Sequence, residues 1–153
     1  CDWSSDVCSS DLEDCAEAFG TRIGERHVGT FGDVATFSFF GNKTVTTGEG
    51  GMVASRDPAV HALICKLRGQ GLVGEREYWH DVVGYNYRIT NLCAAIGVAQ
   101  LERATELVAR KRALAGEMRE ALAGLPLEFH LEQPGTTHSF WMISALEIGR
   151  AHV

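Results

Sequence analysis

The chain has 153 residues, 45% of them hydrophobic, and a formal net charge of −6 at pH 7. The negative charge disfavours nucleic acid and anionic membrane surfaces as partners, because both recruit clustered Lys and Arg. No apolar run approaches the ~20 residues that span a bilayer, and no secretory leader is recognisable. We therefore expect neither a nucleic-acid partner nor a membrane partner.

Both ends of the chain read as foreign sequence. Residues 1–12 resemble the translation of a common sequencing adapter, and residues 147–153 resemble the opposite adapter entered from the other side. We therefore expect the protein sequence proper to cover about residues 13–146, as an internal part of a longer protein. The alternative is a genuine polar N-terminal tail and a short C-terminal helix end.

Three cysteines lie within residues 13–146, namely Cys15, Cys65 and Cys93. No C-x-x-C pair and no paired histidines accompany them, so we expect no metal site. Scattered thiols suit a reducing compartment, and we expect a cytoplasmic protein.

The first predicted elements lead to a single lysine. Residues 13–14 are expected to close a strand, and the glycine-interrupted stretch 21–30 predicts a surface hairpin or loop. Residues 35–40 and 51–54 are apolar runs that predict strands, the first of them buried. The Gly/Thr-rich turn between these two runs holds Lys43. Such a small-residue, mostly uncharged setting desolvates an amine readily, which makes it a nucleophile suited to Schiff-base chemistry.

Three helices and a smaller domain are expected after this turn. Asp57 and Pro58 begin the first helix as N-cap and first helical residue. Thr90 caps a second helix, and residues 105–123 predict a third. Each of the first two helices carries an apolar stripe at helical spacing, made of Val60, Leu63, Ile64 and Leu67 and of Leu92, Ala95, Ile96 and Ala99. The runs 127–129 and 140–145 predict strands of the smaller domain.

Three blocks of sequence resemble, in the same order, the DegT/DnrJ/StrS family of sugar aminotransferases. The blocks are residues 13–20 (EDCAEAFG), 38–52 (SFFGNKTVTTGEGGM) and 84–90 (GYNYRIT). Members of that family are pyridoxal-phosphate enzymes of the aspartate-aminotransferase fold, fold type I. The resemblance therefore implies an α/β fold with a mixed sheet flanked by helices. Residues 13–104 would be the C-terminal part of the cofactor-binding large domain, and residues 105–146 a linking helix and the start of the small domain.

The same resemblance implies roles for five residues. Lys43 corresponds to the lysine that forms the Schiff base, and Asp14 to the carboxylate against the pyridine nitrogen of the cofactor. Glu17 would lie near the cofactor's 3-hydroxyl group, and Ser38 would donate a hydrogen bond to its phosphate. Asn86 resembles the residue that reaches the cofactor phosphate of the neighbouring subunit, which implies a homodimer with a shared active site. The structural alternatives are a solvated lysine, a helix-capping aspartate and a turn packed by aromatic residues.

Within the family, the blocks are closest to the perosamine-forming branch. That branch aminates a GDP-linked 4-keto-6-deoxy sugar, so the resemblance implies such a nucleotide sugar as acceptor and glutamate as amino donor. In family members a Gly-Thr phosphate loop and a ring-stacking aromatic residue lie upstream of these blocks, and part of the sugar-nucleotide pocket lies downstream. We therefore assign the activity to the longer protein and expect the chain by itself to be inactive.

Three other interpretations compete with amino transfer. Lys43-Thr44 resembles the end of a P-loop, but that motif requires glycines where this chain has Asn42 and Phe37. A pyridoxal-dependent sugar dehydratase of the same family would carry His in place of Lys43. The third alternative is an inactive fragment or scaffold, which a bound-cofactor absorbance band lost in Lys43→Ala would exclude.

Overall fold

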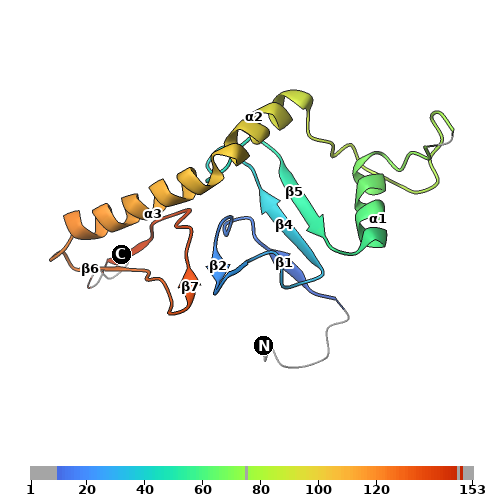
Figure 1. Cartoon of the computed structure of the whole chain (residues 1–153). Coiled ribbons are helices and arrows are strands. Elements are labelled where there is room, and N and C mark those ends of the chain that lie inside the picture. The colour runs from blue at the N-terminus through green and yellow to red at the C-terminus, as the bar shows by residue number, and fades with distance from the viewer. Residues whose placement is uncertain (1–9, 75, 148, 150–153) are drawn as a thin grey trace.

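The structure, a computed structural model, describes residues 10–74, 76–147 and 149. Most of the two adapter-like ends therefore lies outside the described residues, and their predicted origin stays a prediction. The described part combines small β-sheets with three helices. The last helix, α3 (Ala104–Ala121), leads away from the central sheet (Figure 1).

The central sheet has the strand order β1-β4-β5. Its strands are β1 (Leu12–Asp14), β4 (Val34–Ser38) and β5 (Gly51–Ser55). Strand β1 is parallel to β4, with Asp14 opposite Thr36, and β5 is antiparallel to β4. The predicted strand over 35–40 ends at Ser38, and only a single bridge between Phe40 and Gly48 continues it. The sheet is mixed, as the sequence predicts.

A second sheet contains the hairpin expected over residues 21–30. Strands β2 (Arg22–Ile23) and β3 (Arg26–His27) are antiparallel, and Gly24 in their turn has a φ of 57°. Glycine adopts this left-handed conformation without the steric penalty of a Cβ atom. The third strand, β7 (Thr136–Thr137), pairs with β2 and is absent from our sequence prediction. It brings the C-terminal segment back to the N-terminal hairpin.

Glu13 fixes the loop between the hairpin and the central sheet. Its carboxylate oxygens accept hydrogen bonds from the backbone N–H groups of Gly29, Phe31 and Gly32, each at 2.6 Å. Burial works against the charged form, but these three hydrogen bonds outweigh it and hold the pKa of Glu13 below its usual range. The carboxylate thus substitutes for the strand partners that this loop lacks.

We expect Glu13→Gln to lower the free energy of unfolding by about 1 kcal/mol. A neutral amide accepts weaker hydrogen bonds than a carboxylate, and its NH₂ group faces N–H donors at one of the two oxygen positions. Urea unfolding of the two proteins at neutral pH measures the difference. A variant as stable as the wild type would show that the three hydrogen bonds contribute nothing.

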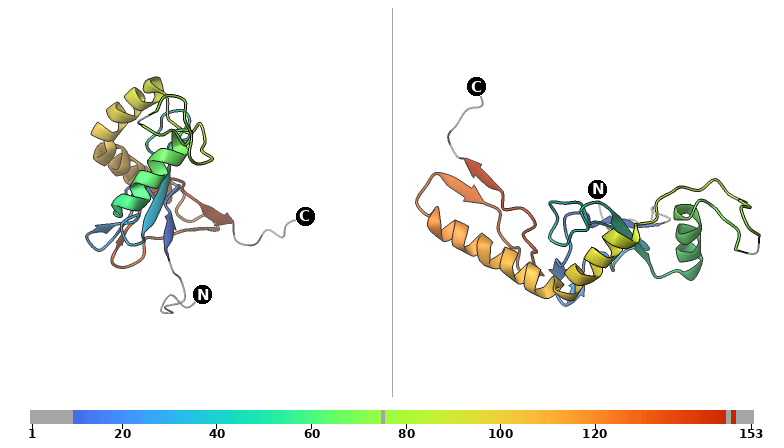
Figure 2. Two further views of the ribbon diagram at one scale, coloured as in Figure 1. Left: turned by 90° about the vertical axis from the view of Figure 1, so that its right-hand side faces the viewer. Right: turned by 90° about the horizontal axis from the view of Figure 1, so that it is seen from above.

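The first two helices begin where the sequence predicts, and the third begins one residue earlier. The three helices are α1 (Pro58–Arg68), α2 (Asn91–Glu102) and α3 (Ala104–Ala121). The Asp57 side chain caps α1 by accepting from two backbone N–H groups, and the Thr90 hydroxyl caps α2. Helices α2 and α3 follow one another along a single arm, separated at Arg103 (Figure 2). The predicted start of the third helix at residue 105 is one residue late.

Residues 41–50, which hold Lys43, are called the lysine turn below. The face of α2 that packs against the lysine turn differs from the predicted one. The stripe of Leu92, Ala95, Ile96 and Ala99 is exposed, whereas Gly97 is the buried residue of the helix. A Cβ atom on Gly97 would lie 2.9 Å from Thr47 Cγ2. The helix therefore approaches the lysine turn through the one position that has no side chain.

The C-terminal segment forms a hairpin of β6 (Leu127–Phe129) with β8 (Ala145–Glu147). The predicted strand over 140–145 is wrong for residues 140–144. Phe140 has a φ of 49°, which no strand contains, and its N–H donates to the Nδ1 atom of His138 at 2.9 Å. This local side-chain hydrogen bond replaces the one that a strand ladder would supply.

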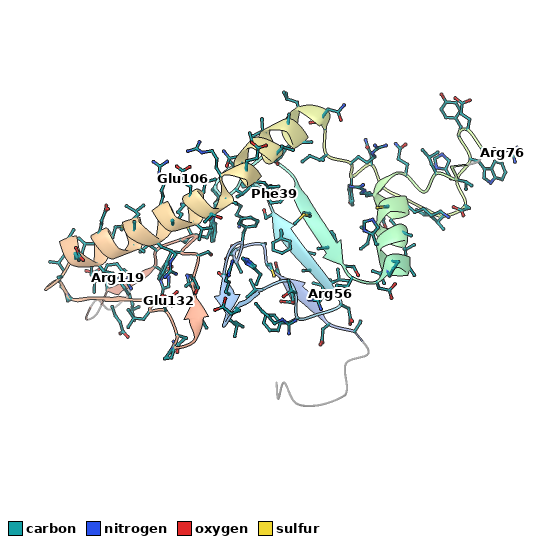
Figure 3. The ribbon with its side chains drawn as sticks, in the orientation of Figure 1. Phe39, Arg56, Arg76, Glu106, Arg119 and Glu132 are labelled. Atoms are coloured by element: carbon teal, nitrogen blue, oxygen red, sulfur yellow. The ribbon has the colours of Figure 1, made fainter. Side chains whose placement is uncertain are left out.

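Much apolar surface stays open in this chain. The accessible surface is 11487 Å², whereas a compact monomer of this mass exposes about 7600 Å². The few buried apolar side chains include Phe39 below α2 (Figure 3). An apolar groove between β5, α1 and α2 remains uncovered, and its lining includes Met52, Val53, Ile64 and Leu101.

Candidate active site

Two predicted site residues lie at the same edge of the central sheet. Asp14 ends β1 and Ser38 ends β4, and these neighbouring strands are parallel, so their carboxyl ends meet. Asp14 is opposite Thr36, and residues two apart on a strand point to the same face. The Asp14 and Ser38 side chains therefore share one face of the sheet at its carboxyl edge. Asp14 is exposed there, and its Oδ1 accepts the N–H of Ala16 at 3.0 Å.

Lys43 lies in the turn that leaves this edge. The turn is closed by backbone hydrogen bonds from Lys43 N–H to Phe40 and from Thr47 N–H to Phe39, at 3.0 and 2.9 Å. Val45 and Thr47 are buried and anchor the turn against the body of the chain. A lysine at this place is thus held by its neighbours close to the end of β4.

The Lys43 ammonium lies between a carboxylate and an aromatic ring. Its Nζ atom is 3.4 Å from Oε1 of Glu17 and 3.8 Å from the centroid of the Trp141 ring. The side chain keeps only 12% of its surface exposed. The expectation of a mostly uncharged setting is wrong, since the Glu17 carboxylate lies within ion-pair distance of the Lys43 amine. Glu17 lies beside Lys43, so the two predicted residues are neighbours within one chain.

Sequence reasoning missed Trp141 as a neighbour of Lys43. The tryptophan is 98 positions further along the chain, in a run that predicts an ordinary strand. No local pattern pairs an aromatic residue with a distant lysine, so only the folded chain brings the two together.

Asn86 lies apart from the other four predicted site residues. It forms a single antiparallel bridge with Gly69, beyond α1, and lines a hollow together with Gln70 and residues 80–84. Within one chain the structure therefore joins Asp14, Glu17, Ser38 and Lys43 in one region and leaves Asn86 elsewhere. Its role toward a neighbouring subunit stays a prediction.

Cys15 lies beneath the same edge but is no candidate nucleophile. It is buried, and burial raises the pKa of its thiol, as do the nearby charges of Glu13 and Asp14. A neutral thiol is a poor nucleophile. Within the described residues, Cys15, Cys65 and Cys93 all carry free thiols.

No metal-binding cluster of three or more His, Cys, Asp or Glu side chains occurs among residues 10–74, 76–147 and 149. In the same part of the chain, none of the helices has the length and apolar character that crossing a membrane demands.

The fold and the site together define an α/β segment in which a shielded lysine lies in the turn that leaves the carboxyl edge of a mixed sheet. The chain belongs to the DegT/DnrJ/EryC1/StrS aminotransferase family, which matches it over residues 11–152. The predicted family is thereby confirmed.

Individual relatives agree with this assignment. The GDP-perosamine synthase of Vibrio cholerae is 56% identical over 135 residues, which are 88% of this chain and 37% of that protein. EpsN of Bacillus subtilis, named as a pyridoxal phosphate-dependent aminotransferase, is 40% identical over 74% of this chain and 29% of its own length. The crystal structure of the aminotransferase TlmJ from Streptoalloteichus hindustanus superposes with a TM-score of 0.80 at 31% identity, covering 88% of this chain and 37% of TlmJ. The predicted fold class, part of a fold-type-I transferase, is confirmed. The matched part of the chain spans 29% to 37% of the length of these relatives.

Proposed function

We propose that the protein to which this segment belongs is a pyridoxal-phosphate-dependent aminotransferase acting on a nucleotide sugar. The observation that carries the proposal is a shielded lysine amine beside the carboxyl edge where Asp14 and Ser38 share one face. Family membership and the likeness to the GDP-perosamine synthase of Vibrio cholerae support the same activity.

The residues present fit the cofactor's chemical groups. An aldehyde calls for an amine, a pyridine nitrogen for a carboxylate, and a phosphate for hydroxyl and N–H donors. Asp14 and Ser38 supply the carboxylate and the hydroxyl from neighbouring strand ends, and Lys43 supplies the amine from the turn that follows β4. Pyridoxal phosphate, when bound, supplies the electron sink that stabilises the substrate carbanion.

Each of these side chains has a separate task in amino transfer. Lys43 would hold the cofactor through its Nζ atom, and once the substrate amine has displaced it, the same atom would accept and return the substrate proton. Asp14 keeps a proton on the pyridine nitrogen, and its exposed carboxylate is free to face a ring placed over the sheet edge. Ser38 Oγ donates to the phosphate, and Glu17 orients Lys43 and the 3-hydroxyl side of the ring.

The family likeness supports a proposal for the substrates and the assembly. We assign glutamate as amino donor and a 4-keto-6-deoxy nucleotide sugar, GDP-linked as in perosamine formation, as acceptor. Asn86, which lies away from Lys43 in its own chain, serves the site of a second subunit in a homodimer. The free thiols suit the reducing cytoplasm as the place of action.

Borohydride trapping tests the proposal directly. A full-length enzyme that carries this segment is incubated with pyridoxal phosphate and reduced, which fixes the pyridoxyl group on the amine that it occupies. We expect peptide mass spectrometry to find the label on Lys43. The sequence has two other lysines, Lys66 and Lys111, which serve as internal controls. Label spread equally over all three, or no label, would overturn the proposal.

A further inference from the structure

Trp141 joins the lysine turn to the C-terminal segment. Its indole Nε1–H donates to the backbone carbonyl of Asn42 at 2.9 Å, directly before Lys43. The centroid of the same ring lies 3.8 Å from Lys43 Nζ. One ring is therefore in contact with both the backbone of the turn and the ammonium that the turn presents.

The position of this ring is set from outside the lysine turn. The Trp141 carbonyl accepts a hydrogen bond from Lys111 Nζ on α3, at 3.5 Å. The two preceding residues, Ser139 and Phe140, are 0% and 3% exposed. Ser139 is further fixed by its contacts with Thr21, whose hydroxyl lies 3.0 Å from its own. Helix α3 and Thr21, at the start of the β2–β3 hairpin, thus fix the position of the Trp141 segment. The indole in turn fixes the lysine turn through Asn42.

We propose that Trp141 is a positioning residue that holds the Lys43 ammonium in place while no cofactor is bound to it; this contact is called the latch. An aromatic face attracts a cation and has little attraction for a neutral amine. The carboxylate on the other side belongs to Glu17, whose side chain is 65% exposed and is screened by water. The ring is thus the better shielded partner. When the lysine nitrogen loses its charge, the ring releases it, while the hydrogen bond to Asn42 keeps the turn in place. The catalytic meaning of the latch depends on the proposed function, but the latch itself does not.

Acylation of the cofactor-free chain measures the latch. The three lysines of the chain compete for limiting acetic anhydride, and peptide mass spectrometry reads the label at each one. Lys66, which pairs with Asp81 beyond α1, is the internal reference. Trp141→Leu removes the ring, so labelling of Lys43 relative to Lys66 should rise about 2- to 30-fold. Trp141→Phe keeps an aromatic face and should stay within about twofold of the wild type.

Trp79→Leu is the matched control. In the loop beyond α1, the guanidinium carbon of Arg76 lies 4.0 Å from the centroid of the Trp79 ring. Removal of this ring should leave the labelling of Lys43 unchanged. Equal labelling in Trp141→Leu and the wild type would overturn the latch. An equal rise of Lys43 labelling in Trp141→Leu and Trp141→Phe would also overturn the latch, because the aromatic face would then not protect the Lys43 amine.

A second measurement leaves Trp141 in place, in case the Leu variant fails to fold. In a Trp3→Phe, Trp79→Phe background Trp141 is the single indole, and Lys43→Met removes the charge above it. We expect the emission maximum of Trp141 to shift, and an unchanged spectrum would contradict the contact. Because both assays omit the cofactor, a failed borohydride trapping with an intact latch would reject only the proposed function.

Discussion

Lys43→Arg is expected to abolish amino transfer in a full-length enzyme carrying this segment. Arginine keeps a positive charge between Glu17 and Trp141, but a guanidinium cannot bond to the cofactor's aldehyde or exchange a proton near neutral pH. The loss of a proton-transferring group alone costs about 10²- to 10⁴-fold in rate. We expect turnover to fall at least that far, as measured by steady-state amino transfer to the nucleotide sugar.

Two further variants sharpen this test. Lys66→Arg changes a lysine that pairs with Asp81 beyond α1, away from the Lys43 turn, and it should leave turnover nearly intact. Lys43→His introduces the residue of the family's dehydratases, and it should lose amino transfer as fully as Lys43→Arg. Sustained turnover in Lys43→Arg would remove Lys43 from its proposed role.

Arg112→Met is expected to give the largest loss of stability, about 2 kcal/mol. The Arg112 guanidinium on α3 forms two hydrogen bonds with the Glu132 carboxylate, at 2.7 and 3.1 Å, and a third with the carbonyl of His138. Both side chains are about two thirds buried, so removing one partner leaves a partly desolvated charge unpaired. Solvent screening keeps the loss below that of a fully buried pair. Urea unfolding at pH 7 measures it.

A surface pair on the same helix provides the control. Arg103 and Glu106 form an ion pair at 2.9 Å, but both side chains are more than half exposed. Glu106→Gln should therefore lower the free energy of unfolding far less than Arg112→Met does, because water screens the exposed pair. If Arg112→Met were no more costly than Glu106→Gln, the pair would not anchor the C-terminal segment on α3.

The same pair makes stability depend on acid. Hydrogen bonding by Arg112 and by the His138 N–H outweighs the opposing effect of burial and lowers the pKa of Glu132 from 4.5 to about 2. A depressed carboxyl pKa stabilises the folded state above the unfolded pKa, and this contribution is lost as the pH falls from about 4.5 to about 2. In that window the wild type should lose about 1–2 kcal/mol more than Glu132→Gln, after allowance for screening. Parallel pH profiles of unfolding would contradict the assignment.

Local sequence accounts for most of the secondary structure. Asp57 and Thr90 can cap helices because their side-chain oxygens reach the free N–H groups of the first turn, which requires no distant partner. The strand before Lys43 follows from an aromatic and β-branched run in the same way. The family blocks likewise predict Asp14, Glu17, Ser38 and Lys43 as neighbours, and the structure places them at or beside one sheet edge.

Other features depend on partners far away in the chain. The pairing of β7 with β2 joins the two ends of the described chain, and no sequence window contains it. On α2, the buried position is Gly97, because close approach to Thr47 requires a residue without a Cβ atom, whatever the apolar stripe predicts.

The sequence by itself determined the family, the starts of the first two helices and the strand before Lys43, because caps, periodicity and motifs act over a few residues. Only the tertiary structure decided the surroundings of that lysine. The expected uncharged pocket became a site between Glu17 and Trp141, since α3 and the C-terminal segment fold back over the turn. Charge and shielding at Lys43 depend on groups within a few ångströms in space, and sequence distance carries no information about them.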